Sequence, residues 1–244
     1  MSETNNTEPV TIYLARHTKT TSNAMGRMQG WSDFPVTREG REIIHCFGRG
    51  LKGITFKAAW CGTLQRHYET ARGALDYSGN ESVSITRDAD LREANFGSFE
   101  GRDINTSVQA AMEELGYASL QAALDTIGTK ANLDLQDGLH ALDQRNVLDT
   151  DLDDEDRAES SKQIQDRMFA AMTRIGQSAL AQGGGNILVV SSGLSLREFL
   201  FRIDSEVDLS DQGNTATTKL RYANGRFTII GPVGSTQYYE RGRE

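Results

Sequence analysis

Residues 13–23 read Tyr-Leu-Ala-Arg-His-Thr-Lys-Thr-Thr-Ser-Asn, so that an apolar segment passes directly into a polar loop. The apolar run from Val10 to Ala15 predicts a buried β-strand. Arg16 and His17 follow it immediately, and open α/β sheets bind their ligands at such strand ends. The pattern favours a fixed cation beside a nucleophile or proton carrier, although an ordinary surface Arg-His pair fits these two residues alone equally well.

The wider pattern is Leu14-x-Arg16-His17-x-x-Thr20-x-x-Asn23, followed by Gln29-Gly30-x-x-Asp33-x-Pro35-Val36-Thr37-x-x-Gly40. This pattern resembles the opening signature of the histidine phosphatase superfamily, which includes the cofactor-dependent phosphoglycerate mutases. Thr18 and Lys19 stand where that family usually has Gly and Glu. The resemblance runs from about Val10 to about Tyr239, apart from a middle segment, and several separated blocks recur in the order of the family.

Composition limits the class of protein. The 244 residues can bury a full core, and 37% hydrophobic with 25% charged residues is ordinary for a globular protein. The chain contains no apolar run of about 18 residues, which argues against a membrane-spanning helix or a membrane partner. The polar, acidic start is no signal peptide, and we expect residues 1–9 to be a flexible tail. A net charge of −8 argues against nucleic acid as a partner and requires local cations for an anionic substrate.

Cys46 and Cys61 form no disulfide framework, which favours a reduced, cytoplasmic setting. The four histidines have no metal-ligand spacing with these cysteines, so we expect neither a metal nor a cofactor. The expected partner is a small phosphorylated substrate or phosphate, and a homodimer is left open.

Strand and helix patterns alternate along the chain, and the resemblance implies how they assemble. We expect an α/β three-layer sandwich: a mostly parallel sheet with helices on both faces and a helical cap insertion. The expected domain is 10–244, with 102–158 as the variable helical and acidic insertion. Strands are predicted at 56–61, 82–86 and 186–191, helices at 38–51, 62–77, 108–124, from 159 onward and 194–203, and a hairpin at 217–230. The acidic run 149–156 is interpreted as solvated or mobile.

Two further blocks carry candidate site residues. Leu64-x-Arg66-x-x-x-Thr70-Ala71 resembles the second signature of the family, whose Arg binds phosphoryl oxygens, and a helix start suits phosphate. Residues 90–101 resemble the third block, whose Glu corresponds to Glu93. A carboxylic acid there can protonate the departing oxygen and later deprotonate water. Glu100 is interpreted as structural, bonded to backbone near a glycine turn.

The resemblance implies two-step phosphoryl transfer through a phosphohistidine on His17, without metal. Glu93 is the expected general acid and base. The other expected catalytic residues are Arg16, Arg66 and Ser192, and the expected phosphate- or substrate-binding residues are Arg16, Thr20, Asn23, Gln29, Gly30, Arg66 and Gly193.

Position 192 departs from the family. Its central strand normally ends Val-Val-Ser-His-Gly, whereas this chain has Val189-Val190-Ser191-Ser192-Gly193. Serine brings no positive charge, and losing one transition-state donor costs about 10²–10³ in turnover. A slow enzyme, an inactive phospho-ligand binder and an engineered replacement of the histidine all fit. The sequence predicts that Ser192→His raises turnover, with His67, His140 and Lys19 as weaker candidates for the missing group.

A phosphatase is the favoured function, and the alternative is an isomerase of the phosphoglycerate mutase type. The mutases usually follow the acidic Glu with Arg-His-Tyr-Gly, whereas this chain has Ala94-Asn95-Phe96-Gly97.

Overall fold

The structure is a computed structural model that describes residues 8–210 and 212–244. Most of the predicted tail, residues 1–7, therefore lies outside the described residues. Within them, six strands form one sheet in the order β3-β2-β4-β1-β5-β6. These strands are β1 (Val10–Arg16), β2 (Phe56–Cys61), β3 (Ile85–Arg87), β4 (Gly185–Ser191), β5 (Thr217–Ala223) and β6 (Arg226–Ile229). The first four run parallel, and β5 and β6 form an antiparallel edge, which confirms the mostly parallel sheet.

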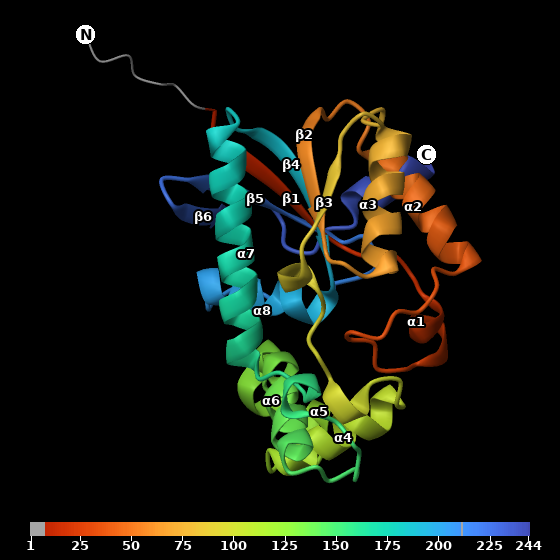
Figure 1. The fold of residues 1–244 in the computed structure, drawn as a ribbon, viewed down its shortest axis with the longest axis vertical. Coiled ribbons are helices and arrows are strands. Elements are labelled where there is room, and N and C mark those ends of the chain that lie inside the picture. Colours follow the sequence, from red (N-terminus) through yellow and green to blue (C-terminus); the bar gives the residue numbers. More distant parts are fainter. Residues whose placement is uncertain (1–7, 211) are drawn as a thin grey trace.

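Helices cover both faces of this sheet (Figure 1). Alternate side chains of β4 explain why: Ile187 and Val189 pack with α7 (Ser161–Ala181) and α8 (Gly193–Ile203). Leu188 and Val190 pack on the opposite face with α2 (Arg38–Gly50), α3 (Gln65–Ser78) and α9 (Gln237–Arg243). A central parallel strand buried on both faces must be apolar throughout, as this one is. The predicted α/β class with helices on both faces is confirmed.

The cap is a group of helices below the sheet in Figure 1: α4 (Ile104–Glu114), α5 (Leu120–Ile127) and α6 (Ala131–Gln144). A small apolar cluster of their own holds α4 and α5 against α6. The single helix predicted at 108–124 is wrong, because the chain breaks after Glu114 and passes through Gly116 at a φ of 83°. The sequence also missed α6, whose acidic residues lie within a regular helix.

The side chain of Arg157 forms hydrogen bonds with the acidic segment that follows α6. Arg157 donates from Nη1 to Asn146 Oδ1 at 2.9 Å and from Nη2 to the Leu152 carbonyl at 3.0 Å. Arg157 also lies 3.5 Å from the buried Asp143 carboxylate on α6. The acidic side chains of 149–156 are exposed to solvent, as the charge pattern favours, while the contacts of Arg157 fix the backbone around Leu152.

Three smaller differences from the sequence prediction concern short elements. β3 is shorter than the predicted strand and begins three residues later. The loop after β1 contains a short helix, α1 (Thr21–Met25), whose N-cap is Thr20. α9 was not predicted; it packs so closely on α2 that a Cβ at Gly50 would lie 1.6 Å from the Tyr238 carbonyl oxygen. In the part of the chain described, no helix combines the length and apolarity needed to cross a membrane.

Candidate active site

The sheet brings the ends of three neighbouring strands together. Arg16 at the end of β1 pairs with Ser191 at the end of the parallel β4, and the His17 N–H donates to the Ser191 carbonyl at 2.9 Å. His17 and Ser192 therefore leave adjacent strands side by side. Cys61 at the end of β2 pairs with Val190, and the chain then turns into the first residues of α3. Residues distant in the sequence thus meet at the carboxyl edge of the sheet, where such folds bind ligands.

His17 is held in the form that a nucleophile needs. Its Nδ1 lies 2.6 Å from the Thr18 carbonyl oxygen. A carbonyl can only accept, so Nδ1 carries the proton and Nε2 keeps its lone pair. Burial lowers the pKa of His17 well below its ordinary value of 6.5, and the positive charges of Arg66 and Arg16 act in the same direction. The imidazole is therefore neutral at physiological pH.

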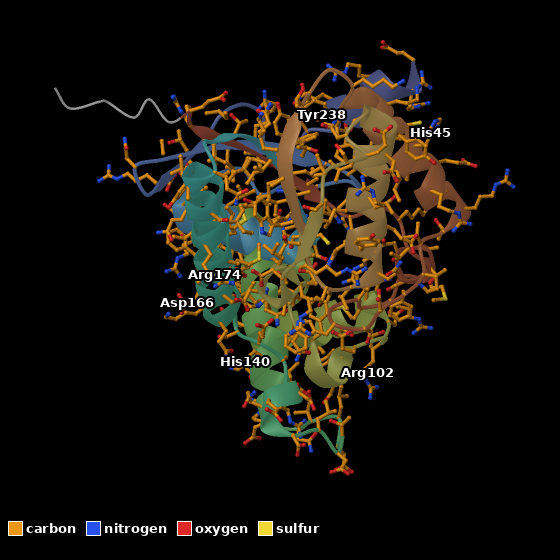
Figure 2. All side chains as sticks on the ribbon, turned by 45° about the horizontal axis from the view of Figure 1, so that its top comes forward. His45, Arg102, His140, Asp166, Arg174 and Tyr238 are labelled. Atoms are coloured by element: carbon orange, nitrogen blue, oxygen red, sulfur yellow. The ribbon has the colours of Figure 1, made fainter. Side chains whose placement is uncertain are left out.

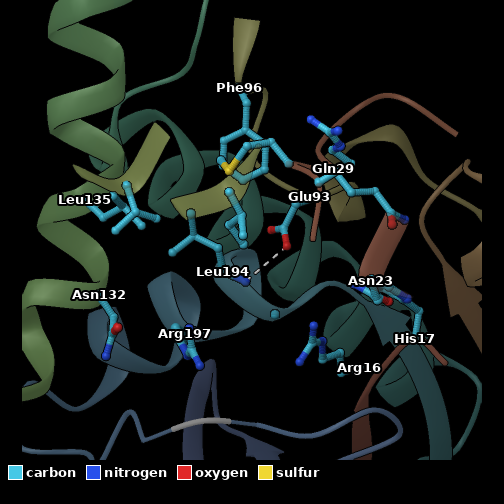
Figure 3. Close-up of a pocket in the computed structure, with 15 residues that line it drawn as sticks. Arg16, His17, Asn23, Gln29, Glu93, Phe96, Asn132, Leu135, Leu194 and Arg197 are labelled. Carbon is cyan, nitrogen blue, oxygen red and sulfur yellow. Dashed lines mark hydrogen bonds between the residues drawn. The ribbon is translucent and has the colours of Figure 1, made fainter. Parts of the chain in front are cut away.

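A cavity of about 260 Å³ lies beside His17 (Figure 3). Its lining contains six of the predicted site residues: Arg16, His17, Asn23, Gln29, Glu93 and Gly193. The other four, Thr20, Gly30, Arg66 and Ser192, lie behind this lining and are completely or almost completely buried.

A chain of hydrogen bonds connects the cavity wall to the residues behind it. Thr20 caps α1 and donates from its hydroxyl to Asn23 Oδ1 at 3.1 Å. With its amide oxygen toward Arg66, Gln29 donates to Thr20 Oγ1 and accepts from Arg66 Nε at 2.9 Å and Nη1 at 3.1 Å. Asn23 and Gln29 are thereby fixed in the wall of the cavity by partners that do not line it.

Arg66, which is predicted to bind phosphoryl oxygens together with Arg16, lies behind the cavity lining. It is fully buried and donates to the Gly30 carbonyl at 2.7 Å and to the Ser32 carbonyl at 3.0 Å. Together with Gln29, these described acceptors occupy all but one of its five N–H hydrogens. Burial lowers the pKa of Arg66 to about 10, so it remains a cation at neutral pH. Arg66 therefore shapes the loop and adds positive potential from behind the cavity wall.

Hydrogen bonds hold Glu93 at both its carboxylate and its backbone carbonyl. Its carboxylate accepts N–H groups from Ala94 at 3.0 Å, Ser195 at 2.8 Å and Leu194 at 3.2 Å, the last drawn in Figure 3. Its backbone carbonyl accepts from Arg167 Nη2 at 2.8 Å. The start of α8 thus orients this carboxylate within the wall that it shares with His17, as a proton carrier requires.

Glu100 has the structural role that the sequence predicted. It accepts backbone N–H groups from four residues, Gly30, Trp31, Ser32 and Phe96, at 2.8–3.2 Å. It therefore fixes the loop whose carbonyls hold Arg66.

Two candidates for the missing cation lie away from the cavity. Lys19 forms an ion pair with Glu39 at 2.6 Å on the surface. His140 lies at the cap end of the molecule (Figure 2), where its Nδ1 is 2.7 Å from the Ala158 carbonyl oxygen. Neither residue lines the cavity. Thr18, at the usual Gly position, is buried and donates to the Gly40 carbonyl at 2.7 Å, which is a structural contact.

The third candidate, His67, lies beside the site. Its Nε2 is 2.7 Å from Ser192 Oγ, and its ring centroid is 5.6 Å from that of His17. Both His67 and Ser192 are fully buried. An imidazole at position 192 would stand next to the ring of His67, and the gain in turnover expected from Ser192→His stays a prediction.

Sequence reasoning missed the other residues that line the cavity. Three polar residues, Arg27, Asn132 and Arg197, lie in its wall, together with the apolar residues Met28, Phe96, Ile104, Val108, Leu135 and Leu194. Ile104 and Val108 come from α4, and Asn132 and Leu135 come from α6. Their helical spacing could have indicated one face of a helix, but not that this face closes a cavity at the edge of a distant sheet.

Comparisons with known proteins agree with this geometry. The family model of the histidine phosphatase superfamily (branch 1) matches residues 12–131. The 2,3-bisphosphoglycerate-dependent phosphoglycerate mutase of Bartonella tribocorum is 31% identical over 93 residues, which are 37% of this chain and 45% of that relative. This chain thus matches less than half the length of the curated relative.

Similarity to solved structures covers nearly the whole chain. The crystal structure of phosphoglycerate mutase from Bacillus anthracis str. Sterne superposes with a TM-score of 0.85 and 30% identity, over 98% of this chain and 99% of that chain. Phosphoserine phosphatase from Entamoeba histolytica, in complex with 3-phosphoglyceric acid, has a TM-score of 0.63 at 18% identity, over 94% and 99% of the two chains. The second likeness concerns the fold alone.

Proposed function

This chain belongs to the histidine phosphatase superfamily, and from that premise we propose that it hydrolyses small phosphomonoesters through a phosphohistidine on His17. The observation that carries the proposal is the neutral His17 imidazole, with Nδ1 pinned and Nε2 unprotonated, in the wall of a cavity that also contains Arg16 and Glu93. A nucleophile, a cation and a carboxylate around one cavity are the parts that phosphoryl transfer needs.

The reaction has two balanced steps. His17 Nε2 uses its lone pair to form the P–N bond while the P–O bond to the ester breaks, and a protonated Glu93 gives its proton to the departing oxygen. Water then attacks phosphorus, Glu93 takes a proton from it, and the P–N bond breaks to release phosphate. Arg16 in the wall and Arg66 behind it offset the charge on the phosphoryl oxygens.

The cavity supports a small organic substrate rather than a macromolecule. Its volume is about 260 Å³, and helices α4 and α6 of the cap provide its far wall. The helices contribute Val108, Leu135 and Asn132 to the lining, which also contains the cations Arg27 and Arg197 from other parts of the chain. A phosphomonoester with a short, partly apolar body that carries a polar group fits this lining.

An isomerase of the phosphoglycerate mutase type is the second candidate, because curated relatives and the solved structure at 30% identity carry that name. The residues after Glu93 favour hydrolysis instead. Ala94 is fully buried, and Asn95 donates to the Asp156 carbonyl at 3.2 Å and accepts the Gly97 N–H at 2.9 Å. Neither offers the cavity the basic groups that the resemblance places there in mutases.

The purified chain should release inorganic phosphate from p-nitrophenyl phosphate and from small alkyl phosphomonoesters. A parallel assay offers 3-phosphoglycerate with and without a 2,3-bisphosphoglycerate primer. Primer-dependent formation of 2-phosphoglycerate, faster than phosphate release, would identify the isomerase. Binding of phosphate without either reaction would identify a non-catalytic phospho-ligand binder.

A further inference from the structure

Three polar side chains meet at one side of the cavity, one in its wall and two behind it, and each comes from the segment that follows a different strand. His17 follows β1, Ser192 follows β4, and His67 lies in the first turn of α3, which follows β2. The rings of His17 and His67 are 5.6 Å apart, and Ser192 Oγ lies 2.7 Å from His67 Nε2. The mechanism described above assigns no role to His67, although it is fully buried at the centre of this group.

The Ser192 side chain does not cap the helix that it precedes. Ser192 is the N-cap of α8, where a serine hydroxyl normally accepts an N–H from the first turn of the helix. Among the described residues its side chain receives no such bond. The candidate donors, the N–H groups of Leu194 and Ser195, donate to Glu93 instead. The Ser192 hydroxyl is thus available to the site, with His67 as its partner.

The surroundings of His67 determine which ring nitrogen carries the proton. Nδ1 is buried without a hydrogen-bond partner among the described residues, and it lies against Gly62, where an added Cβ would come within 2.2 Å. Buried N–H groups without an acceptor are rarer than buried acceptors without a donor. Burial, and next the charge of Arg66, lower the pKa of His67 well below 6.5, so the ring is neutral. Nε2 therefore carries the proton and donates it to Ser192 Oγ.

A hydroxyl oxygen that accepts from His67 must direct its own hydrogen elsewhere. Positions 17 and 192 leave neighbouring parallel strands, which lie about 4.8 Å apart. Gly193, the next residue, lines the cavity and packs against Arg16, whose Nε would lie 3.3 Å from a Cβ at position 193. Ser192 itself is fully buried behind this lining, so its hydroxyl can meet a phosphoryl oxygen only where the group on His17 enters beside Gly193.

We propose that His67 is a positioning residue for phosphoryl transfer: its Nε2–H holds Ser192 Oγ so that the serine hydroxyl donates to a phosphoryl oxygen. This inference rests on the proposed function. The relay replaces a charged donor at this corner by two neutral hydrogen bonds in series, one from His67 to Ser192 and one from Ser192 to the phosphoryl group. It also requires an imidazole at position 67 that cannot be exchanged for an apolar side chain of similar volume.

The test compares Ser192→Ala, His67→Ala, the double variant Ser192→Ala/His67→Ala and His67→Gln. We measure kcat on p-nitrophenyl phosphate and the affinity for orthovanadate, which mimics the transferring group. Each alanine variant should lose about 10²-fold in kcat, as expected for one transition-state donor. The double variant should lose no more than either single variant, because both remove the same hydrogen bond to phosphorus. His67→Gln should recover much of the rate, because its amide N–H can still donate to Ser192.

Losses that multiply in the double variant, or a Ser192→Ala variant with the original kcat, would overturn the relay. If His67→Ala does not fold, Ser192→Ala and His67→Gln decide the question on their own. The original chain separates this inference from the proposed function. If it hydrolyses no phosphomonoester, the proposed function fails, and equal orthovanadate affinity in all folded variants then overturns the relay as well.

Discussion

At the scale of single residues, protonation in this site is set by burial rather than by ion pairs. His17 and His67 are buried beside Arg66, and both have a pKa well below that of a free imidazole. Glu93 is instead fixed by backbone N–H groups at the start of α8. The nucleophile is thus kept neutral, while the carboxylate is oriented by donors that do not titrate.

The role of Glu93 as proton donor predicts a dependence on the leaving group. Glu93→Gln should slow an alkyl phosphate far more than p-nitrophenyl phosphate, because only the alkoxide needs a proton in order to leave. The amide can replace the carboxylate sterically, so the fold should persist. The measurement is kcat/KM for both esters in both proteins. Equal losses on the two esters would mean that Glu93 acts structurally, through Leu194 and Ser195.

The same buried groups predict how stability depends on pH. Below about pH 6.5 the unfolded chain protonates His17 and His67 while the native state does not, so the native state loses stability as the pH falls. Glu198 acts in the opposite direction. Burial raises its pKa to about 7 from 4.5, so the native state binds a proton that the unfolded chain lacks. The two histidines outweigh the single carboxyl, so stability should fall as the pH is lowered below about 6.5, less steeply than the histidines alone would give.

Glu198→Gln removes the opposing group and should make the loss of stability with falling pH steeper. The amide oxygen can still accept from Gln165, which lies 2.7 Å from the Glu198 carboxylate. Urea unfolding of both proteins at several pH values measures the two slopes. Identical slopes would show that Glu198 is ionised in the native state.

At the scale of elements, the parts with strong local signals were predicted and the cap was not. The strands at the centre of the sheet and the hairpin at 217–230, which turns at Asn224-Gly225, follow from local sequence. In the cap, by contrast, the helices bury only a few residues on small faces. The alanine- and leucine-rich pattern therefore predicted one helix where the chain turns at Gly116 and forms two. The unpredicted α9 depends on close backbone contact with α2, for which two distant glycines give no local signal.

Asp143 connects the cap to the site at the level of elements. Its buried carboxylate accepts N–H groups from Ser98 at 3.2 Å and Ala158 at 2.7 Å, beside Arg157. A Cβ at Gly97 would lie 1.9 Å from Asp143 Oδ2, so the residue before Ser98 must be glycine.

Asp143→Ala leaves two buried N–H donors, those of Ser98 and Ala158, without an acceptor and removes the carboxylate beside Arg157. It should destabilise the protein by about 3–5 kcal/mol in chemical unfolding. Asp143→Asn is the matched control: it keeps an acceptor but not the charge, and it should cost less. A loss below about 1 kcal/mol for the alanine variant would mean that the cap is held mainly by its apolar cluster.

At the scale of the whole molecule, the sequence predicted which residues gather at the sheet edge. It did not predict which of them line the cavity and which lie behind it. Blocks at positions 16–23, 66 and 93 were assigned to one site from their resemblance to a family. The strand order then places Arg66 behind the cavity and brings His67 to Ser192. No local pattern could indicate this, because positions 67 and 192 are neighbours only once β2, β4 and β1 lie side by side.

The central claim is that His17 becomes covalently phosphorylated, and it is tested most directly by rapid quenching of the chain with ³²P-labelled phosphomonoester, followed by peptide mapping. The account predicts an acid-labile, base-stable label on His17 that forms at least as fast as turnover and is absent in His17→Ala. A label on another residue, or hydrolysis by His17→Ala at the original rate, would contradict it.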